Sequence, residues 1–239
     1  MGSLVLVRHG QASFLQDDYD KLSPKGETQS RLLGEFWASR RLVFDRVFSG
    51  PLVRQIRSAE ITGESYAASG HGFPQPEIIP ELQEYNADAI MAGFLPLLSE
   101  RHAHVRELAR AYERSGNGPE RYKSFQKVFE VVMGSWLEGA LEPPGIESWR
   151  EYRDRVRQAV ARMTAGRSGG RKIAAFTSGG PISVALQLAL GVSDQTAIEL
   201  NWRIRNCSLT EFLFSGDRFS LDSFNGLPHL VDPALWTYR

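Results

Sequence analysis

The sequence has almost no cysteine, since Cys207 is the only one among 239 residues. A single thiol excludes an intrachain disulfide and a zinc site built from several cysteines, and it is typical of a reducing compartment. Long apolar runs are also missing: residues 182–190, the longest, are interrupted by Ser183 and Gln187 and are too short to span a bilayer. Because the first strand is expected to begin near Leu4, leaving no room for a signal peptide, we expect a cytoplasmic protein.

An excess of charge of either sign is absent as well. The 28 basic residues balance the 28 acidic ones. No overall electrostatic field therefore favours a nucleic acid or a membrane as a partner, and any preference for anionic ligands must be local. The length fits one α/β domain with a sizeable core better than two independent domains.

The most informative stretch is an apolar run at residues 4–7 that stops at Arg8, His9 and Gly10. Consecutive Leu and Val residues predict a buried strand, central and parallel. In open α/β sheets, ligands bind at the loop that leaves the carboxyl end of such a strand. Arginine, histidine and glycine at that place offer a cation, a nucleophile and a close backbone approach, a combination that suits phosphoryl transfer.

Strands and helices alternate along most of the remaining sequence. Ser23 followed by Pro24 predicts the N-cap and the first position of a helix. The alternation predicts an α/β fold, a three-layer α/β/α sandwich with a mainly parallel sheet and a hairpin at the sheet edge. The expected strands cover residues 44–49, 77–79 and 173–177, the hairpin covers 207–214 and 219–224, and further helices cover about 52–66, 149–163 and 182–190.

The helix expected at residues 149–163 has a regular apolar stripe, and Cys207 is expected to be a small buried side chain. Residues 87–144 interrupt the alternation, because they are helical in composition and close on two prolines and a glycine. We interpret them as a helical cap inserted within a single domain that spans residues 1–239. The members of the stripe, at steps of three and four, are Trp149, Tyr152, Val156, Val160 and Met163.

Five short blocks occur in a fixed order along the chain. They are Arg8-His9-Gly10, Leu22-Ser23 with Gly26 and Gln29, Ser49-Gly50-Pro51-Leu52-Val53-Arg54, Leu82-Gln83-Glu84, and Gly145-Ile146-Glu147-Ser148. Together they resemble the histidine phosphatase superfamily, the phosphoglycerate-mutase-like fold. The resemblance covers nearly the whole chain, with the cap region matched least.

The resemblance implies a role for each matching residue. His9 would be the nucleophile that forms a phosphohistidine, and Glu84 would be the general acid that protonates the leaving alkoxide and then activates water. Arg8 and Arg54 would bind the phosphoryl oxygens through their planar guanidinium groups. The further phosphate-binding residues implied are Gln11, Ser178 and Gly179, with the backbone N–H groups of Gly179 and Gly180 at a helix start. No metal ion or cofactor is implied.

The chain departs from this family at Ser178, where the family normally has a second histidine. A serine hydroxyl can donate one hydrogen bond but is shorter than an imidazole and is never cationic. Losing a preorganised donor to the transition state costs on the order of a hundred- to a thousandfold in rate. We therefore expect a slow or narrow phosphomonoesterase, and the alternative is a catalytically silent protein that binds a phosphorylated ligand.

A second departure concerns the substrate. Phe14 and Leu15 stand where the mutase branch has an asparagine, and Tyr85-Asn86-Ala87 replaces a fuller Tyr-Gly block. Hydrolysis of a monoester is therefore expected rather than mutase chemistry. The substrate is expected to be a phosphorylated small molecule or a phosphopeptide. The oligomeric state stays open, a homodimer included.

Several assignments have a competing interpretation. Glu81 competes with Glu84 as the acid, whereas Arg57, a neighbour of Arg54, is interpreted as a solvated or structural partner because only Arg54 matches the family block. Residues two apart on a helix do not share a face, so His102 and His104 are interpreted as surface residues rather than metal ligands. A stripe of cap arginines is either solvated or selects a carboxylate or second phosphate; its members are Arg106, Arg110 and Arg114.

Overall fold

The computed structural model describes residues 1–13, 20–116, 118–166 and 169–238. The chain forms two compact units. The first combines Met1–Glu84 with Arg155–Arg239 and contains the sheet, and the second is the helical stretch Tyr85–Asp154. Phe14 and Leu15, which the sequence singles out as a departure from the mutase branch, lie outside the described residues.

Within the described residues, one six-stranded sheet has the order β3-β2-β4-β1-β5-β6. Strand β1 pairs with β4 in parallel, as β2 does with β4 and β3, whereas β5 is antiparallel to both β1 and β6. The predicted mainly parallel sheet and its hairpin at the edge are therefore confirmed. The strands are β1 (Gly2–Arg8), β2 (Arg46–Ser49), β3 (Glu77–Ile78), β4 (Lys172–Thr177), β5 (Leu209–Ser215) and β6 (Arg218–Gly226).

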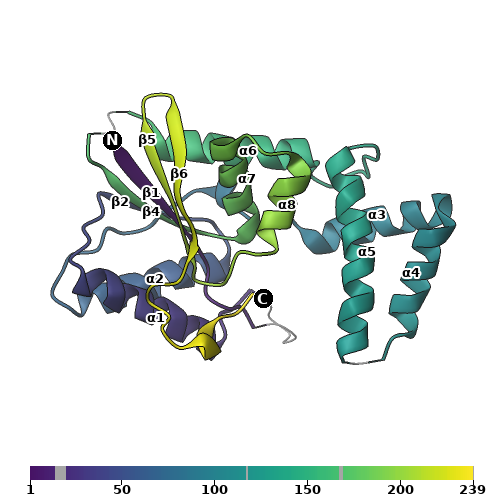
Figure 1. Cartoon of the computed structure of the whole chain (residues 1–239), viewed down its shortest axis with the longest axis horizontal. Coiled ribbons are helices and arrows are strands. Elements are labelled where there is room, and N and C mark those ends of the chain that lie inside the picture. The colour runs from purple at the N-terminus through teal and green to yellow at the C-terminus, as the bar shows by residue number, and fades with distance from the viewer. Residues whose placement is uncertain (14–19, 117, 167–168, 239) are drawn as a thin grey trace. The chain divides into compact units, whose positions relative to one another are not determined.

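Helices cover both faces of the sheet, as Figure 1 shows. On one face lie α1 (Pro24–Ser39) and α2 (Val53–Ala67), and on the other lie α6 (Trp149–Thr164), α7 (Gly179–Leu190) and α8 (Asp194–Asn201). Side chains of β1 alternate between the two cores: Leu4 and Leu6 pack with residues of α6 and α7, and Val5 and Val7 with residues of α1 and α2. Burial on both faces explains why this strand has a continuous apolar sequence.

The helix starts depend on local capping. Ser23 caps α1 as predicted, because its hydroxyl accepts a hydrogen bond from the Gly26 N–H at 3.1 Å and Pro24 takes the first helical position. Helix α7 starts at Gly179, three residues before the predicted residue 182. Glycine is a poor helix former, but at Gly179 it leaves room for a neighbour, because an added Cβ would lie 2.1 Å from Asn201 Oδ1 and the Asn201 side chain would have to move.

The stripe on α6 and Cys207 are buried as predicted. Helix α8 was not predicted, although Ser193 caps it by accepting a hydrogen bond from the Thr196 N–H at 3.1 Å. A short 3-10 turn, η1 (Pro80–Leu82), leads toward Glu84, and a second, η2 (Pro233–Leu235), lies near the C-terminus.

The unit Tyr85–Asp154 contains three helices of its own, as the composition of residues 87–144 predicts: α3 (Ala87–Arg101), α4 (Ala103–Arg114) and α5 (Pro119–Glu138). Its core includes a cluster of aromatic rings whose centroids lie 5.3 to 5.8 Å apart. The rings belong to Tyr85, Trp136, Trp149 and Tyr152. That this unit acts as a cap within a single domain stays a prediction.

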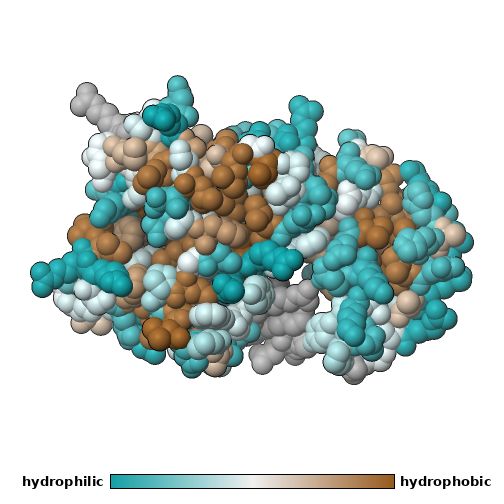
Figure 2. Space-filling view, in the orientation of Figure 1, coloured by the Kyte–Doolittle hydropathy of each residue, from teal (hydrophilic) through white to brown (hydrophobic). Residues whose placement is uncertain are grey.

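Hydrophobic surface gathers over the β5–β6 hairpin and the adjoining α7 (Figure 2). Leu188 and Leu190 of α7 are 41% and 49% exposed, and Phe219 and Leu221 of β6 are partly buried against the core. Exposed apolar side chains are ordinary on protein surfaces, and the oligomeric state stays open. Among the described residues, the structure has no helix with both the length and the apolar character needed to span a bilayer.

Candidate active site

His9 directly follows β1, at the edge where the parallel strands β1, β2 and β4 end. Its ring is 4% exposed. Nδ1 lies 2.7 Å from the carbonyl oxygen of Gly10, and Nε2 lies 3.2 Å from Nε of Arg54. A carbonyl oxygen can only accept and a guanidinium N–H can only donate, so the proton is on Nδ1 and Nε2 holds a lone pair.

The surroundings of His9 keep its imidazole neutral. Burial lowers the pKa of His9 well below its ordinary value, the positive charges of Arg54 and Arg8 lower it further, and the bond to Gly10 opposes them weakly. A neutral ring with a free electron pair on Nε2 is the form that attacks an electrophile. The nucleophile predicted from the sequence thus has the protonation state and the tautomer that its role needs.

The loop after β1 packs tightly on the first turn of α1. A Cβ on Gly10 would lie 2.4 Å from the carbonyl oxygen of Gly26, and a Cβ on Gly26 would lie 2.1 Å from that of Gln11. Ser58 of α2 accepts a hydrogen bond from the Gly10 N–H at 2.9 Å. Both glycines are therefore needed for backbone to approach backbone, which fixes the direction in which His9 leaves the sheet.

Arg54, in the first turn of α2, is 7% exposed and joins His9 to Asp20. Its Nη1 lies 2.7 Å from Asp20 Oδ1, and Asp20 Oδ2 accepts a hydrogen bond from the Val53 N–H at 2.9 Å. Asp20 thus caps α2 and neutralises part of the charge that would bind a phosphoryl group. Arg8 is half-buried, and its Nη1 donates a hydrogen bond to the carbonyl oxygen of Ile204.

Glu84 lies at the start of α7, where its Oε2 accepts a hydrogen bond from the Gly180 N–H at 3.0 Å. The structure thus brings Glu84 to the same helix start that the sequence predicts for the phosphate. Glu81 has no such contact, and its Oε2 has no hydrogen-bond partner among the described residues.

Ser178 is fully buried, and its Oγ accepts a hydrogen bond from Nε2 of Gln55 at 2.8 Å. Gln11 is half-buried, with its Oε1 accepting from the Ser23 hydroxyl at 3.0 Å. Both contacts are with other side chains, so neither is evidence that the residue binds a phosphoryl group. The phosphate-binding roles of Ser178, Gly179 and Gln11 stay predictions.

Three residues that contact predicted site residues have no signal of their own in a sequence motif: Asp20 bonds to Arg54, Gln55 to Ser178, and Asn206 to His9. Asn206 Nδ2 donates to the His9 carbonyl oxygen at 3.4 Å, and the Cys207 N–H donates to the same oxygen at 3.1 Å. No periodic pattern or local motif marks these residues, because each reaches the site through tertiary contacts. Gln55 alone had a signal, its position next to Arg54.

The competing assignments divide as follows. Arg57 is half-buried and pairs with Glu60 and Glu64, both at 3.1 Å, in agreement with its interpretation as a solvated or structural partner. His102 and His104 are also exposed. In the ranges that the structure describes, no group of three His, Cys, Asp or Glu side chains is placed to hold a metal ion. Along α4, the exposed Arg106 and Arg114 donate to backbone carbonyls within their own unit.

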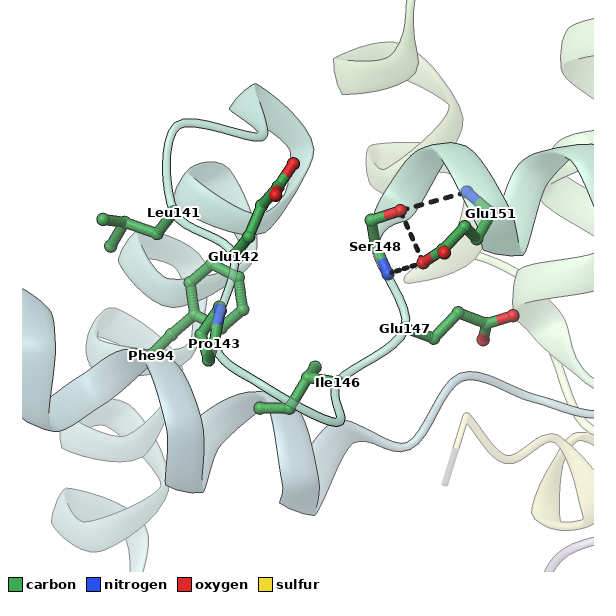
Figure 3. A pocket seen from close by; sticks show the side chains of 8 residues that line it. All are labelled: Phe94, Leu141, Glu142, Pro143, Ile146, Glu147, Ser148 and Glu151. Atoms are coloured by element: carbon green, nitrogen blue, oxygen red, sulfur yellow. Dashed lines mark hydrogen bonds between the residues drawn. The ribbon is translucent and has the colours of Figure 1, made fainter.

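A hollow of about 200 Å³ lies within the unit Tyr85–Asp154 (Figure 3). Its lining includes Glu142, Glu147 and Glu151, and Glu151 forms a capping box with Ser148 at the start of α6. Three carboxylates and no cation make it unsuited to a phosphorylated ligand. The Ser148 that the sequence places in a family block therefore has a structural role at the helix start.

A family model described as the histidine phosphatase superfamily (branch 1) matches residues 4–132 and 96–226. The chain belongs to this superfamily. The family resemblance of the sequence blocks is thereby confirmed. Within the superfamily the chain keeps the arginine, histidine and glycine at the end of β1, and Ser178 follows β4.

Solved structures of the same fold include phosphatases and a mutase. Mycobacterial glucosyl-3-phosphoglycerate phosphatase is 21% identical with a TM-score of 0.60, over 94% of this chain and 99% of that one. Phosphoserine phosphatase from Entamoeba histolytica, in complex with 3-phosphoglyceric acid, is 18% identical with a TM-score of 0.61, over 97% and 100%. Phosphoglycerate mutase from Bacillus anthracis is 16% identical with a TM-score of 0.62, over 96% and 95%. At these identities the likeness shows the fold.

Proposed function

We propose that the chain is a metal-independent phosphomonoesterase that acts through a phosphohistidine on His9. The observation that carries the proposal is the buried, neutral His9, whose Nδ1 is held by the Gly10 carbonyl and whose Nε2 faces the Arg54 guanidinium. A nucleophile beside a cation matches the attack on an anionic phosphoryl group. Phosphatases among the structural neighbours support the reaction class.

In the first step, the Nε2 lone pair of His9 attacks phosphorus and the ester P–O bond breaks. The leaving alkoxide takes a proton from Glu84, which must therefore enter the step protonated. Arg54 turns its N–H from Nε2 to a phosphoryl oxygen, so the same movement frees the nucleophile and neutralises the developing charge. Arg8 adds a second guanidinium to the same oxygens.

In the second step, water attacks the phosphohistidine and gives a proton to the Glu84 carboxylate. The P–N bond breaks, its electron pair returns to Nε2, and inorganic phosphate leaves. Gly10 keeps the ring orientation through both steps, because its bond to Nδ1 involves the nitrogen that does not react. The hydrogen bond from the Gly180 N–H to Glu84 Oε2 holds the Glu84 carboxyl group at the start of α7 through both steps.

One observation favours a second function, binding of a phosphorylated ligand without turnover. Ser178 is fully buried against Gln55, so the donor that the family supplies with its second histidine is not replaced by an exposed hydroxyl. A site with two arginines and no such donor can bind a phosphate and react slowly or not at all. We expect slow turnover on simple monoesters.

Release of phosphate from an aryl phosphate and from a panel with phosphoserine and 3-phosphoglycerate separates the two functions. Wild type is compared with His9→Ala. Turnover in wild type that His9→Ala loses supports the phosphatase, and the panel begins to define the substrate class. No turnover by wild type, together with measurable vanadate binding, supports the binding protein.

A further inference from the structure

Gln55 is a buried amide with every polar contact satisfied. It directly follows Arg54 in α2 and is fully buried. Its Oε1 accepts a hydrogen bond from the Leu52 N–H at 3.1 Å, and its Nε2 donates to the Leu82 carbonyl oxygen at 3.2 Å and to Ser178 Oγ at 2.8 Å. The Leu52 N–H can only donate and the Leu82 carbonyl can only accept, so the orientation of the amide is fixed.

These three contacts come from three separate segments at the carboxyl edge of the sheet. Leu52 follows β2, Leu82 ends η1 two residues before Glu84, and Ser178 follows β4. Thr177, at the end of β4, also donates to the Leu82 carbonyl oxygen at 2.8 Å. Gln55 thus fixes the position of the backbone that leads to Glu84 relative to the end of β4.

Space for this amide is provided by Gly50. A Cβ at position 50 would lie 2.2 Å from Gln55 Oε1, which is too close for the Gln55 amide to keep this position. On the other side, the amide nitrogen is in hydrogen-bond contact with Ser178. An imidazole at position 178 is larger than a hydroxyl and would extend into volume that Gln55 already fills.

We propose that Gln55 is a positioning residue of this active site, which fills the volume next to Ser178 and sets the position of Glu84. It acts through the Ser178 hydroxyl and the Leu82 carbonyl and does not touch the substrate. The catalytic part of this inference rests on the proposed function, whereas the fit between the side chains at positions 55 and 178 does not.

A first test removes the amide but keeps its volume, with Gln55→Met. Displacing the segment that carries Glu84 lowers kcat on an aryl phosphate by at least about tenfold, since small misplacements of a catalytic group are costly. KM changes by less than about twofold, because the phosphoryl group is held by Arg8 and Arg54. The matched control is Gln187→Met, which removes another buried amide, bonded to Asp194 at 2.5 Å, from the last turn of α7.

The control variant is expected to lose stability and keep the wild-type kcat. The proposal is contradicted if Gln55→Met has the kcat of wild type, or if Gln187→Met loses as much kcat as Gln55→Met. A loss of kcat that goes with an equal change in KM also contradicts it, because such a loss would indicate a disrupted phosphate site.

A second test is a double-mutant cycle of Ser178→His with and without Gln55→Ala, measured as vanadate affinity, aryl phosphate hydrolysis and thermal unfolding. In the wild-type background Ser178→His lowers Tm and gains no vanadate affinity. In the Gln55→Ala background, Ser178→His raises Tm above that of Gln55→Ala alone and tightens vanadate binding by at least about tenfold. The reason is that the imidazole then has room and adds a hydrogen-bond donor.

The cycle distinguishes failure of this inference from failure of the proposed function. Hydrolysis by wild type decides the proposed function, whereas the vanadate and Tm cycle decides the fit of positions 55 and 178 even if no variant hydrolyses a substrate. An effect of Ser178→His that is the same in both backgrounds overturns the inference. Failure of Ser178→His to fold both in the wild-type background and together with Gln55→Ala also overturns the inference. If Ser178→His fails to fold alone but folds together with Gln55→Ala, the inference is supported.

Discussion

At the scale of single residues, burial and two neighbouring arginines keep the His9 ring neutral. Because they lower its pKa well below the ordinary value, the ring stays neutral through the pH range in which an exposed histidine titrates, near about 6.5. NMR of ring-labelled histidines, with His9→Gln to assign the signals, should show His9 shifts unchanged between about pH 7.5 and pH 6. A midpoint near 6.5 would contradict this prediction.

His229 is a second buried histidine and makes the fold sensitive to acid. Burial lowers its pKa to about 4, and neither ring nitrogen has a hydrogen-bond partner among the described residues. The unfolded chain takes up this proton near pH 6.5, whereas the folded chain does so only near 4, so the stability is present above 6.5 and is lost as pH falls to 4.

The prediction is that His229→Phe removes this loss. Between pH 7 and pH 5 the wild-type free energy of unfolding should fall by about 2 kcal/mol more than that of the variant. Urea unfolding of both proteins at the two pH values measures the difference. Equal losses in wild type and variant would show that His229 is not responsible.

Asp20 competes with a phosphoryl group for Arg54. Its Oδ1 lies 2.7 Å from Arg54 Nη1, and its charge also repels an anion. Asp20→Asn keeps an oxygen that can accept from the Val53 N–H and removes the charge, so we expect inorganic phosphate to bind several-fold tighter, on the order of tenfold. Titration calorimetry with phosphate measures the change, and unchanged or weaker binding would exclude the competition.

At the scale of elements, the close approach of α1 and α2 depends on Gly34. A Cβ at this position would lie 2.3 Å from the Thr62 carbonyl oxygen, whereas a Cβ on Gly134 of α5 would meet nothing within 4 Å. Replacing a helical glycine by alanine normally stabilises a helix by about 0.5–1 kcal/mol. We expect Gly134→Ala to do so and Gly34→Ala to destabilise by about 1–3 kcal/mol, as overpacking does.

Chemical denaturation of the two variants beside wild type tests this contrast. The stabilised Gly134→Ala controls for helix propensity, so only packing separates the two substitutions. Gly34→Ala as stable as wild type would mean that the two helices can separate without cost.

Elements with a strong repeating pattern could be predicted from the sequence, and elements set by one tertiary contact could not. Strand β1 has apolar residues on both faces, and α6 carries an apolar stripe that is buried along its length. Helix α7 starts at Gly179, which lies close to Asn201 of α8, and no local pattern reveals such a tertiary contact. Helix α8 has eight residues, too short to show a clear period.

For the whole molecule, the same division separates the parts of the candidate site. His9, Arg54 and Glu84 stand in short motifs that follow β1, β2 and β3 along the chain, so their resemblance to a family and the topology of the sheet predict that they lie at one edge. Asp20, which follows β1, and Gln55, in the first turn of α2, contact Arg54 and Ser178 through tertiary structure alone. These contacts could therefore not be predicted from the sequence and are seen only in the folded structure.

The central claim is that His9 Nε2 takes the phosphoryl group from a monoester. The most direct measurement is mass spectrometry of the protein quenched in alkali shortly after mixing with an aryl phosphate, where phosphohistidine is preserved. One added phosphoryl group is expected on the peptide that contains His9, appearing with a burst of released alcohol and absent from His9→Ala. Turnover without any phosphoryl group on that peptide, or turnover that His9→Ala retains, would contradict it.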